Sequence, residues 1–510
     1  MIKFAIIGTS SISEKFIDAL KSTEGCEAYA LLSRDENKGK RFAEKFGIEK
    51  IYTNIEEMLK DKDIQAVYIA SPNGKHFEQA KLSLEAGKNV ICEKPIVPTV
   101  KEFDILKEIA IKNRVVLMEA MRPTTNPNFK LIKENLYKIG AIRQVMLKYC
   151  QYSSRYDLLK AGEVTNIFDK NMSGGALYDI GVYPLYFTLA MFGEPKEYMG
   201  SNYLLSSGVD GCGTIILKYP DKIGVISYSK ITDEKTPSEI IGEDGSIVID
   251  KVSTVKGITI KYRDGREEKI EVDTYTNDMR YEIEEFAKLI EEGRVESTLN
   301  SFATSRKCVE IMEMQILDNK VQGRVIDKLR ENIKFGTRLS IISAYFTIYA
   351  YEELRKELGK IEKLRLLFSE PTFVKNKKDI NREFKLSGSY ERGLAGDRYE
   401  MKLKNELKQS EIAKECANWI REKVEVRAYD EEYPLPQKMY LMENKKDESA
   451  CIFGSSDFTS SGLGLVPSKK LEANTYIKDS IYTQQLLNQF ELYWNDKDKV
   501  KDVKTYLLKS

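Results

Sequence analysis

The segment Ala86-Gly87-Lys88-Asn89-Val90-Ile91-Cys92-Glu93-Lys94-Pro95 decides how the first part of this chain is organised. Its apolar run indicates a buried strand, and the strand ends in an acid, a lysine and a proline that reverses the chain. A lysine at the carboxyl end of a buried parallel strand can contact both a bound cofactor and a substrate. We therefore expect Lys94 to be the centre of a functional site.

A second motif lies at the start of the chain. Ile2-Lys3-Phe4-Ala5-Ile6-Ile7-Gly8 is typical of a buried parallel strand, and a helical pattern follows over residues 16–20. A strand, a turn of small residues and a helix form the context in which a dinucleotide pyrophosphate lies at a helix amino terminus. Serines at positions 10 and 13 replace small residues of the usual fingerprint, so a plain turn is the alternative. The predicted pyrophosphate-binding residues are Gly8, Thr9, Ser10, Ser11 and Ile12.

The second strand distinguishes between two forms of the nucleotide. Glu27 to Leu32 reads as a strand that ends in Ser33-Arg34, where a site for NAD places an acid on the ribose hydroxyls. An arginine beside a hydroxyl suits the 2′-phosphate of NADP instead. We therefore predict NADP, with Ser33 and Arg34 as ligands. The neighbouring Asp35 keeps NAD open, and an exposed arginine at a helix start is the alternative for Arg34.

Further strands alternate with helices up to about residue 122. Gln65–Ala70 reads as a strand followed by Ser71-Pro72-Asn73, a helix begins at His76, and Val115–Ala120 forms the last strand. This alternation predicts an α/β domain over residues 1–122 with a doubly wound parallel sheet. The residues expected at its cofactor edge are Ala70, Ser71, Pro72, Asn73, His76, Glu93 and Lys94.

Residues 123–317 contain a second chemical motif, Ser173-Gly174-Gly175-Ala176-Leu177-Tyr178-Asp179-Ile180-Gly181-Val182-Tyr183-Pro184. Asp179 and Tyr183 are four residues apart, so on a helix their side chains share a face. Alternating strands follow between residues 213 and 250, and helices are predicted over 280–292 and 301–314. This pattern predicts an α+β domain with an open antiparallel sheet. Arg155 could face the substrate from this domain or form a structural ion pair.

In this order, the motifs resemble those of the Gfo/Idh/MocA family of NAD(P)-dependent oxidoreductases. The resemblance rests on the Gly8-Thr9 turn, Ser33-Arg34, Ser71-Pro72-Asn73 with His76, AGKNVICEKP and GGALYDIGVY. It implies a Rossmann domain (1–122) and a substrate and dimerisation domain (123–317), whose open sheet face commonly forms dimers. We therefore expect a homo-oligomer. The resemblance also places His76 beside the nucleotide and makes Tyr183 the proton donor or acceptor.

The chemistry of Lys94, Asp179 and Tyr183 suits hydride transfer. Interconversion of an alcohol and a carbonyl also moves a proton on oxygen, and an unperturbed tyrosine titrates only near pH ~10. A nearby ammonium ion favours the phenolate, so Lys94 would help Tyr183 to move that proton. Lys94 can also donate to the substrate oxygen, while Asp179 would hold a substrate hydroxyl or orient Lys94. We predict catalysis by these three residues on a sugar, sugar derivative or polyol. The alternative makes Tyr183 a packed aromatic and Asp179 a helix cap.

From about residue 316 the pattern changes. A helix (328–333), a strand (339–346) and a helix–strand pair ending at Glu370 precede the segments Gln437–Leu441 and Ala450–Leu463. These two segments resemble the HxK…GSxN pattern of the phospholipase-D-like domain at the front of certain bacterial helicases. The resemblance implies an α/β phospholipase-D-like domain over residues 318–510.

The tail departs from that pattern where the chemistry lies. Pro436 stands where the nucleophilic histidine belongs, Glu443 takes the acid position, and Asp457 replaces the asparagine. Cleavage of a phosphodiester there needs a histidine nucleophile, yet the single histidine of the chain is His76. We therefore predict an inactive module, in which Lys438 and Ser455 could still hold a phosphate.

Composition limits the remaining classes. Lys and Arg number 80 against 79 Asp and Glu, so no overall charge draws the chain to nucleic acid or membrane. No apolar run is long enough to span a bilayer, and Met1-Ile2-Lys3 leads directly into a strand, so no signal peptide is expected. Seven scattered cysteines predict a reducing cytoplasm and no metal site. The rival function is nucleic-acid binding through the helicase-type tail, with the dehydrogenase part as a scaffold.

Overall fold

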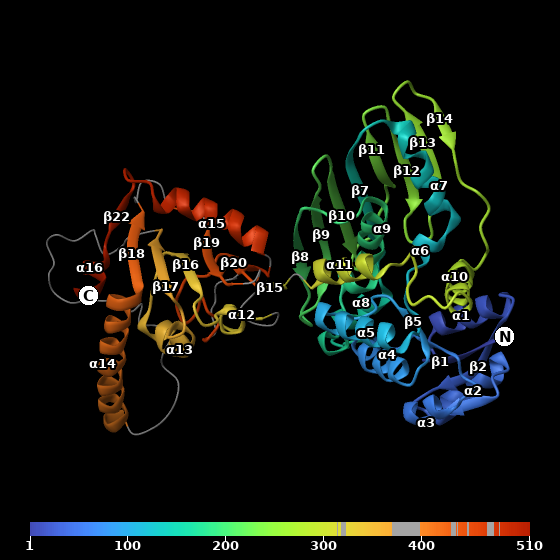
Figure 1. Cartoon of the computed structure of the whole chain (residues 1–510), viewed down its shortest axis with the longest axis horizontal. Helices are drawn as coiled ribbons and strands as arrows, with labels where there is room; N and C mark the ends of the chain where they lie inside the picture. The colour runs from blue at the N-terminus through green and yellow to red at the C-terminus, as the bar shows by residue number, and fades with distance from the viewer. Residues whose placement is uncertain are drawn as a thin grey trace. The chain divides into compact units, whose positions relative to one another are not determined.

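The computed structural model describes residues 1–313, 315–317, 323–369, 398–429, 435, 437–445, 448–466, 474–478 and 480–509. The chain forms two compact units, Met1–Glu313 and Met314–Ser510, which are labelled by element in Figure 1. Among the described residues, no helix is both long enough and apolar enough to cross a membrane.

The first unit begins with a six-stranded parallel sheet in the order β3-β2-β1-β4-β5-β6. This is the strand order of a doubly wound Rossmann sheet, in which the direction of winding reverses between β1 and β4. The predicted fold of the first domain is therefore confirmed. The strands are β1 Ile2–Ile7, β2 Cys26–Leu32, β3 Lys50–Tyr52, β4 Ala66–Ile69, β5 Asn89–Glu93 and β6 Leu117–Ala120.

Helices bury both faces of this sheet. Phe4 and Ile6 of β1 pack with Phe16 on one face, together with Phe286 from a helix much later in the chain. Ala5 and Ile7 belong to the core on the opposite face, because successive side chains of a strand point to opposite sides. The helices are α1 Ser11–Lys21, α2 Glu36–Phe46, α3 Ile55–Lys60, α4 His76–Glu85, α5 Val100–Asn113 and α10 Met279–Glu291.

An eight-stranded sheet follows, in the order β14-β13-β12-β11-β7-β10-β9-β8. Its neighbouring strands are antiparallel except β7 and β10, which pair in parallel. The parallel pair arises because the chain passes through helices and two further strands before β10 returns beside β7. The strands are β7 Ile142–Cys150, β8 Glu197–Leu204, β9 Asp210–Lys218, β10 Ile223–Ser229, β11 Ser238–Gly242, β12 Gly245–Lys251, β13 Lys256–Tyr262 and β14 Glu267–Lys269.

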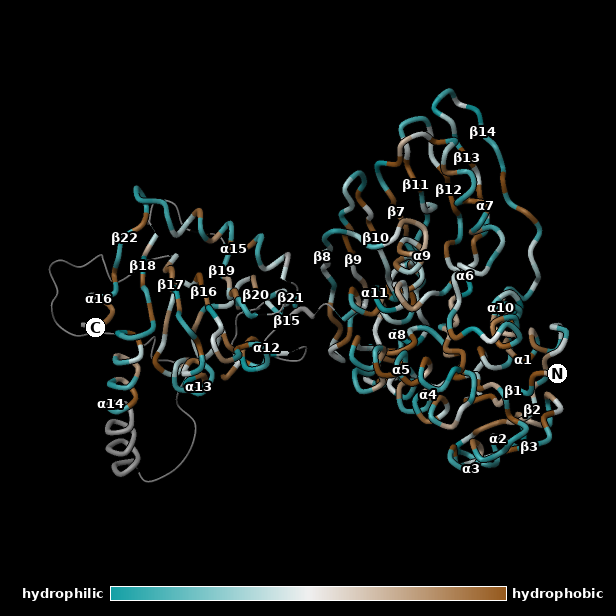
Figure 2. Tube along the Cα trace, viewed as in Figure 1, coloured by the Kyte–Doolittle hydropathy of each residue, from teal (hydrophilic) through white to brown (hydrophobic). Residues whose placement is uncertain are grey.

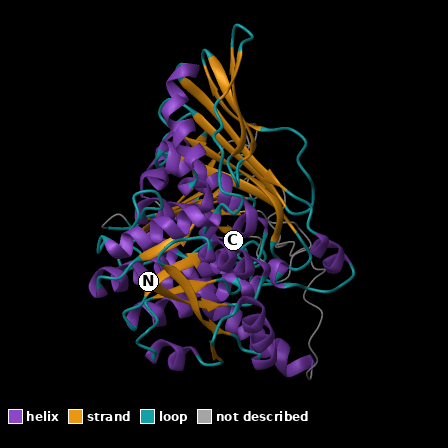
Figure 3. Cartoon of the chain, turned by 90° about the vertical axis from the view of Figure 1, so that its right-hand side faces the viewer, coloured by secondary structure: helices purple, strands orange, loops and turns teal. Residues whose placement is uncertain are grey.

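Helices cover one face of this second sheet. The helix α9 (Val182–Phe192) is apolar almost throughout, as its brown trace in Figure 2 shows, and it contacts β7 and β10. Figure 3 shows the long orange strands with helices packed against one side. The remaining helices of the unit are α6 Arg122–Thr125, α7 Pro127–Asn135, α8 Ser154–Lys160 and α11 Phe302–Met312.

The second unit is an α/β domain around a mixed sheet in the order β15-β21-β20-β19-β16-β17-β18-β22. The central strands β16, β17 and β18 are parallel, and β19 pairs antiparallel with β16. Residues 315–317 form β15 at one edge of this sheet. The strands are β15 Gln315–Leu317, β16 Arg338–Ser343, β17 Lys363–Phe368, β18 Val424–Tyr429, β19 Lys438–Glu443, β20 Ala450–Gly454, β21 Asn474–Ile477 and β22 Val500–Asp502.

Helices lie on both faces of the tail sheet as well. One core includes side chains of α12, α13 and α14, and a second core on the other face includes Leu487, Phe490 and Trp494 of α15. Glu370 and Pro436, which were part of the sequence pattern, lie outside the described residues. The helices are α12 Val325–Asn332, α13 Ile348–Leu358, α14 Arg398–Lys423, α15 Ser480–Trp494 and α16 Lys504–Lys509.

Candidate active site

The turn after β1 has the shape that a pyrophosphate site requires. Gly8 has a φ of +111°, and a Cβ added there would lie 2.7 Å from the carbonyl oxygen of Ala70, so only glycine fits. Ser10 occupies the N-cap of α1, but in this described region its side chain makes no capping hydrogen bond to the helix. Its hydroxyl instead lies 3.3 Å from that of Ser13. Thr9 belongs to the turn, and Ser11 and Ile12 open the helix, whose first amide groups lack a side-chain cap.

The end of β2 presents an arginine rather than a free acid. The Ser33 hydroxyl donates to the backbone carbonyl of Asp35 at 2.8 Å, and the Asp35 carboxylate accepts from the N–H of Lys38 at 3.0 Å. Asp35 therefore caps α2, while Arg34 between them is exposed.

Loops after β4 and β5 are tied together by His76. Its two ring nitrogens each lie 2.9 Å from a backbone carbonyl oxygen, one of Ser71 and one of Pro95. The ring is completely buried, and burial lowers the pKa of His76. The Ser71 hydroxyl donates to Gln79 at 2.6 Å. His76 thus links two loops at the carboxyl edge of the parallel sheet, where the sequence expected it to adjoin the nucleotide.

The same edge contacts the second chemical motif. The Asn73 side-chain amide, which follows Ala70, Ser71 and Pro72, donates to the carbonyl of Ser173 at 2.9 Å. This bond joins residues one hundred positions apart, so the loop after β4 supports the glycine-rich segment.

Lys94 lies where the two motifs meet. Its ammonium group donates to the backbone carbonyl of Asp179 at 2.7 Å and to Oδ1 of the same residue at 3.3 Å. It also lies 5.0 Å from the centre of the Tyr183 ring. The side chain of Lys94 is 13% exposed. The structure therefore brings Lys94, Asp179 and Tyr183 together, as the sequence predicted.

A second lysine reaches the same carboxylate. Lys230, which follows β10, forms an ion pair with Oδ2 of Asp179. Burial alone would raise the pKa of Asp179, but Lys94 and Lys230 lower it to about 2. Burial would likewise lower the pKa of Lys94, yet Tyr183, Asp179 and Glu93 raise it. Lys94 and Asp179 are thus an ion pair at neutral pH.

The segment that carries Asp179 is wound in an unusual way. Leu177–Gly181 forms a π-helical turn that continues into α9, and such turns are frequent at functional sites. Before it, Gly175 has a φ of +123°, and a Cβ there would collide with Oδ1 of Asp210. Oδ2 of Asp210 accepts from the N–H of Leu177 at 2.8 Å. Asp210 thereby anchors the start of the turn that presents Asp179.

Arg122 and Tyr149 contact Tyr183, and Asp278 pairs with Arg122. Arg122 donates to its hydroxyl oxygen at 3.4 Å and forms an ion pair with Asp278 at 2.9 Å. The ring of Tyr149 packs edge-on against that of Tyr183, with 5.8 Å between centroids. No motif in the sequence pointed to these residues or to Lys230. Arg122 and Lys230 each follow a strand, as Lys94 does, and this was the signal available for them.

Two other predicted residues have different contacts. Glu93 is buried and accepts a hydrogen bond from the Tyr68 hydroxyl at 2.7 Å. The backbone N–H of the exposed Arg155 donates to the Ser153 hydroxyl at 3.3 Å, at a helix cap. Among the described residues, no group of three or more His, Cys, Asp or Glu side chains could hold a metal ion.

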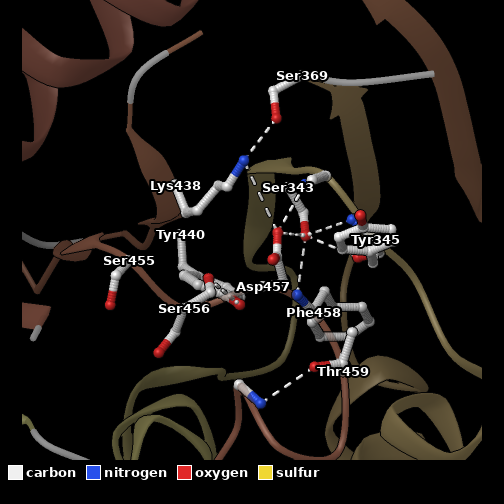
Figure 4. Close-up of polar contacts among 12 residues, drawn as sticks. Ser343, Tyr345, Ser369, Lys438, Tyr440, Ser455, Ser456, Asp457, Phe458 and Thr459 are labelled. Atoms are coloured by element: carbon white, nitrogen blue, oxygen red, sulfur yellow. Dashed lines mark hydrogen bonds and ion pairs between the residues drawn. The ribbon is translucent and has the colours of Figure 1, made fainter. Parts of the chain in front are cut away.

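The tail contains a separate polar cluster, shown in Figure 4. Lys438, at the start of β19, donates to the Ser369 hydroxyl at 2.7 Å and lies 3.9 Å from Oδ1 of Asp457. The same oxygen accepts from the N–H of Ala344 at 2.7 Å and from the Ser343 hydroxyl at 3.1 Å. The Ser455 side chain points away from Lys438 in Figure 4.

The acid expected in this cluster is elsewhere. Glu443 ends the strand that Lys438 begins, so four residues of extended chain separate the two side chains. Burial raises the pKa of Glu443, and Arg365 lies 3.7 Å from it. The structure therefore brings Lys438 and Asp457 together, but it joins neither Ser455 nor Glu443 to them.

The first unit has the fold of a two-domain, dinucleotide-dependent oxidoreductase. Comparison with known proteins gives its family. Residues 2–121 match the model of the Gfo/Idh/MocA oxidoreductase family, NAD-binding Rossmann fold, and residues 131–248 match a Gfo/Idh/MocA C-terminal domain. The chain belongs to this family and, as predicted, is an NAD(P)-dependent oxidoreductase.

Individual relatives cover the same part of the chain. The scyllo-inositol 2-dehydrogenase (NADP(+)) IolU of Bacillus subtilis is 45% identical over 61% of this chain and 95% of its own. The uncharacterized oxidoreductase YgjR of Escherichia coli is 40% identical over 58% of this chain and 90% of its own. A solved 3-ketoreductase from Actinomadura kijaniata, in complex with NADP and TDP-benzene, superposes with a TM-score of 0.56 at 23% identity. The match covers 61% of this chain and 96% of the ketoreductase chain. This comparison shows a likeness of fold.

Proposed function

We propose that this chain is an NADP-dependent dehydrogenase acting on a hydroxyl group of a sugar, sugar derivative or polyol. The observation that carries the proposal is the meeting of Lys94, Asp179 and Tyr183 at the carboxyl edge of the parallel sheet. A relative with 45% identity is named as a scyllo-inositol 2-dehydrogenase that uses NADP, which supports both the nucleotide and a polyol substrate.

The residues around the turn after β1 fit a dinucleotide. Gly8 leaves room for close approach of a ligand, and the uncapped amino terminus of α1 offers amide donors to a pyrophosphate. The exposed guanidinium of Arg34 would bind the 2′-phosphate, with Ser33 beside it, because Asp35 is engaged as a helix cap. Ala70, Ser71, Pro72, Asn73, His76 and Glu93 would shape or support the wall of the site. A bound nicotinamide supplies the acceptor or donor of the hydride.

The protein groups supply the proton chemistry. Lys94 would donate to the substrate oxygen and stabilise the negative charge that develops there. Tyr183 would receive the proton of the alcohol during oxidation and return it during reduction. Asp179 holds Lys94 through two acceptors, so we assign it an orienting role.

Nucleotide preference and substrate class can be tested separately. Titration of the full chain with NADPH and with NADH should give tighter binding of NADPH, and Arg34→Ala should weaken NADPH more than NADH. Equal affinities would remove the NADP assignment. Turnover would then be followed by NADPH absorbance with scyllo-inositol, other inositols and aldoses. A protein that binds the nucleotide but oxidises none of them would contradict the substrate class.

The exposed face of the second sheet supports a homo-oligomer. Met199, Ile216, Val225 and Met146 lie in register on the adjacent strands β8, β9, β10 and β7, and three of them are 40–50% exposed. We infer that a second copy covers this apolar row. Ile216→Lys should lower the mass measured by light scattering, whereas Tyr137→Lys, an exposed aromatic outside the row, should not. An unchanged mass for Ile216→Lys would exclude this interface.

For the tail, we propose a phospholipase-D-like domain without catalytic activity. The lysine that would meet a phosphate is paired with Asp457 and hydrogen-bonded to Ser369, and the tail contains no histidine. We retain a three-domain division at 1–122, 123–317 and 318–510. We also propose a cytoplasmic location, because seven cysteines scattered along the chain suit a reducing compartment.

The rival role of the tail is binding of nucleic acid. Salt-dependent binding of single- or double-stranded DNA by the full chain, lost after deletion of residues 318–510, would favour that role. Retained dehydrogenase turnover in the same deletion would show that the tail is not needed for the chemistry. Hydrolysis of a phosphodiester substrate by the full chain, abolished by Lys438→Met, would overturn the inactive assignment.

A further inference from the structure

Arg122 joins the proposed catalytic tyrosine to Asp278, the N-cap residue of α10. It follows Met121, the residue after β6, and opens the short helix α6. One arm of its guanidinium donates to Oδ1 of Asp278 at 2.9 Å, and the other donates to the hydroxyl oxygen of Tyr183 at 3.4 Å. The side chains of Arg122 and Asp278 are only 18% and 12% exposed. Resting on the proposed function, we propose that Arg122 is a positioning residue that directs the Tyr183 proton toward the substrate.

The hydrogen-bonding capacity of the groups around Tyr183 limits where its hydroxyl proton can point. A guanidinium has five N–H donors and no acceptor, so Arg122 can only donate to the Tyr183 oxygen. The single hydroxyl proton of Tyr183 must therefore point away from Arg122. Lys94, 5.0 Å from the centre of the ring, is also a donor without an acceptor. Because both neighbouring cations can only donate, neither accepts the hydroxyl proton of Tyr183. That proton can therefore pass to another group, which in the working enzyme is the substrate oxygen.

The charge of Arg122 acts in the same direction. Arginine stays protonated throughout the pH range in which proteins are stable. Burial alone would lower the pKa of Arg122, but Tyr183 and Asp278 beside it raise the pKa. When Tyr183 gives up its proton, a fixed positive charge beside the oxygen stabilises the phenolate. The guanidinium therefore both orients the proton and favours its removal.

The surroundings keep Arg122 in place. Asp278 is the N-cap residue of α10, so the ion pair links that helix to the first residue of α6, 156 positions earlier. Glu282, one turn along α10, is fully buried, and neither of its carboxylate oxygens has a hydrogen-bond partner in the described part of the chain. Burial raises the pKa of Glu282 well above its usual value. Asp278 is the acid that pairs with Arg122.

The charged and titratable groups around Tyr183 come from several elements. They are Glu93 and Lys94 at the end of β5, Tyr149 on β7, Asp179 in the π-helical turn, Lys230 after β10, and Asp278 and Glu282 at α10. Lys94 and Lys230 are both paired with Asp179. Arg122 is the one cation among these groups that donates directly to the Tyr183 hydroxyl within the described residues.

The first test compares three variants of the full chain in polyol oxidation. Arg122→Met should lower kcat by about 10- to 100-fold with KM changed by less than about threefold, and Arg122→Lys should recover part of the loss. In Arg122→Met the pH at which kcat is half-maximal should also move upward. Arg306→Met, which removes a paired arginine bonded to Asp104 and Glu310, should leave both unchanged. Equal effects of Arg122→Met and Arg306→Met, or an unmoved pH profile, would overturn the proposal.

A second test does not depend on activity. With 3-fluorotyrosine placed at position 183, the fluorine NMR signal of the full chain at one neutral pH reports on the hydroxyl environment. The signal should shift in Arg122→Met and, by a smaller amount, in Asp278→Asn, which keeps the size of the side chain. An unshifted signal in both variants would overturn the role of Arg122. Shifted signals in a protein that turns over no polyol would instead mean that the proposed function is wrong while the positioning of Tyr183 stands.

Discussion

Lys94 and Asp179 lie 85 residues apart in the chain, yet Lys94 donates to both the backbone carbonyl and the side chain of Asp179, at 2.7 and 3.3 Å. The backbone bond ties the lysine of the Rossmann domain to the turn that precedes α9. The position of Lys94 therefore depends on the fold of the substrate domain as well as on its own strand.

Replacement of the two lysines on Asp179 should have unequal effects. Lys94→Met should lower kcat by about 10²- to 10⁴-fold, because it removes the donor beside Tyr183. Lys230→Met removes the other partner of the same carboxylate and should cost about tenfold or less. Steady-state kinetics with a polyol, with NADPH affinity measured in parallel, would compare them. Equal losses in kcat would mean that the rate depends on the pairing of the Asp179 carboxylate by both lysines. The position of Lys94 beside Tyr183 would then not be decisive.

The glycine before the π-helical turn should not tolerate a side chain. Gly175→Ala places a Cβ against Asp210 and should displace the segment that carries Asp179, lowering both the melting temperature and kcat. Gly25→Ala is the matched control, because Gly25 also has a positive φ of +78° but has no heavy atom within 4 Å of an added Cβ. It should cost about 1–2 kcal/mol of stability and leave kcat unchanged. Similar activity losses in both variants would exclude a special role for the Gly175–Asp210 contact.

The stability of the first unit should vary with pH because of one buried acid, Glu119. Burial raises the pKa of Glu119 to about 7, although the N–H of Ile96 and other hydrogen bonds oppose the shift. A folded pKa above the unfolded value means that the native state holds the extra proton. The associated stability is complete below pH ~4.5 and is lost as pH rises through about 7.

Glu119→Gln should therefore flatten the decline in melting temperature between pH 5 and 8 and raise the melting temperature at the alkaline end. Differential scanning fluorimetry across that range gives the measurement. Glu108→Gln, an exposed acid on the neighbouring α5, should retain the slope of the unmodified chain. A slope that is unchanged in Glu119→Gln would assign the pH dependence to other groups.

The stability of the tail should depend more on Asp457 as a hydrogen-bond acceptor than on the charge of Asp457. Asp457→Asn keeps an oxygen for the Ala344 N–H and the Ser343 hydroxyl and loses only the 3.9 Å ion pair with Lys438. Asp457→Ala leaves both donors without that acceptor and should destabilise the tail by about 1–3 kcal/mol. Thermal unfolding of the tail transition would separate the two variants. Equal losses in Asp457→Asn and Asp457→Ala would show that the ion pair dominates, because both variants remove it.

The sequence by itself determined the elements and the main chemical residues of the first unit. Strand and helix periods, together with glycine and proline positions, are local properties of the chain. They located β1, β2, β4, β5 and β6, the turn at Gly8 and the lysine after β5. The motif spacing also indicated that Asp179 and Tyr183 share one side of a helix, and the family resemblance implied that they meet Lys94.

The tertiary structure alone decided which distant side chains complete the site. Arg122, Lys230 and Asp278 converge on Tyr183 and Asp179 from three separate elements, and the parallel pairing of β7 with β10 brings Lys230 there. In the tail, only the folded sheet showed that Lys438 pairs with Asp457 while Ser455 points away. The physical reason is the same in both units. A residue's backbone preference is expressed within a few neighbours, whereas its contacts depend on how whole elements pack, which no local pattern records.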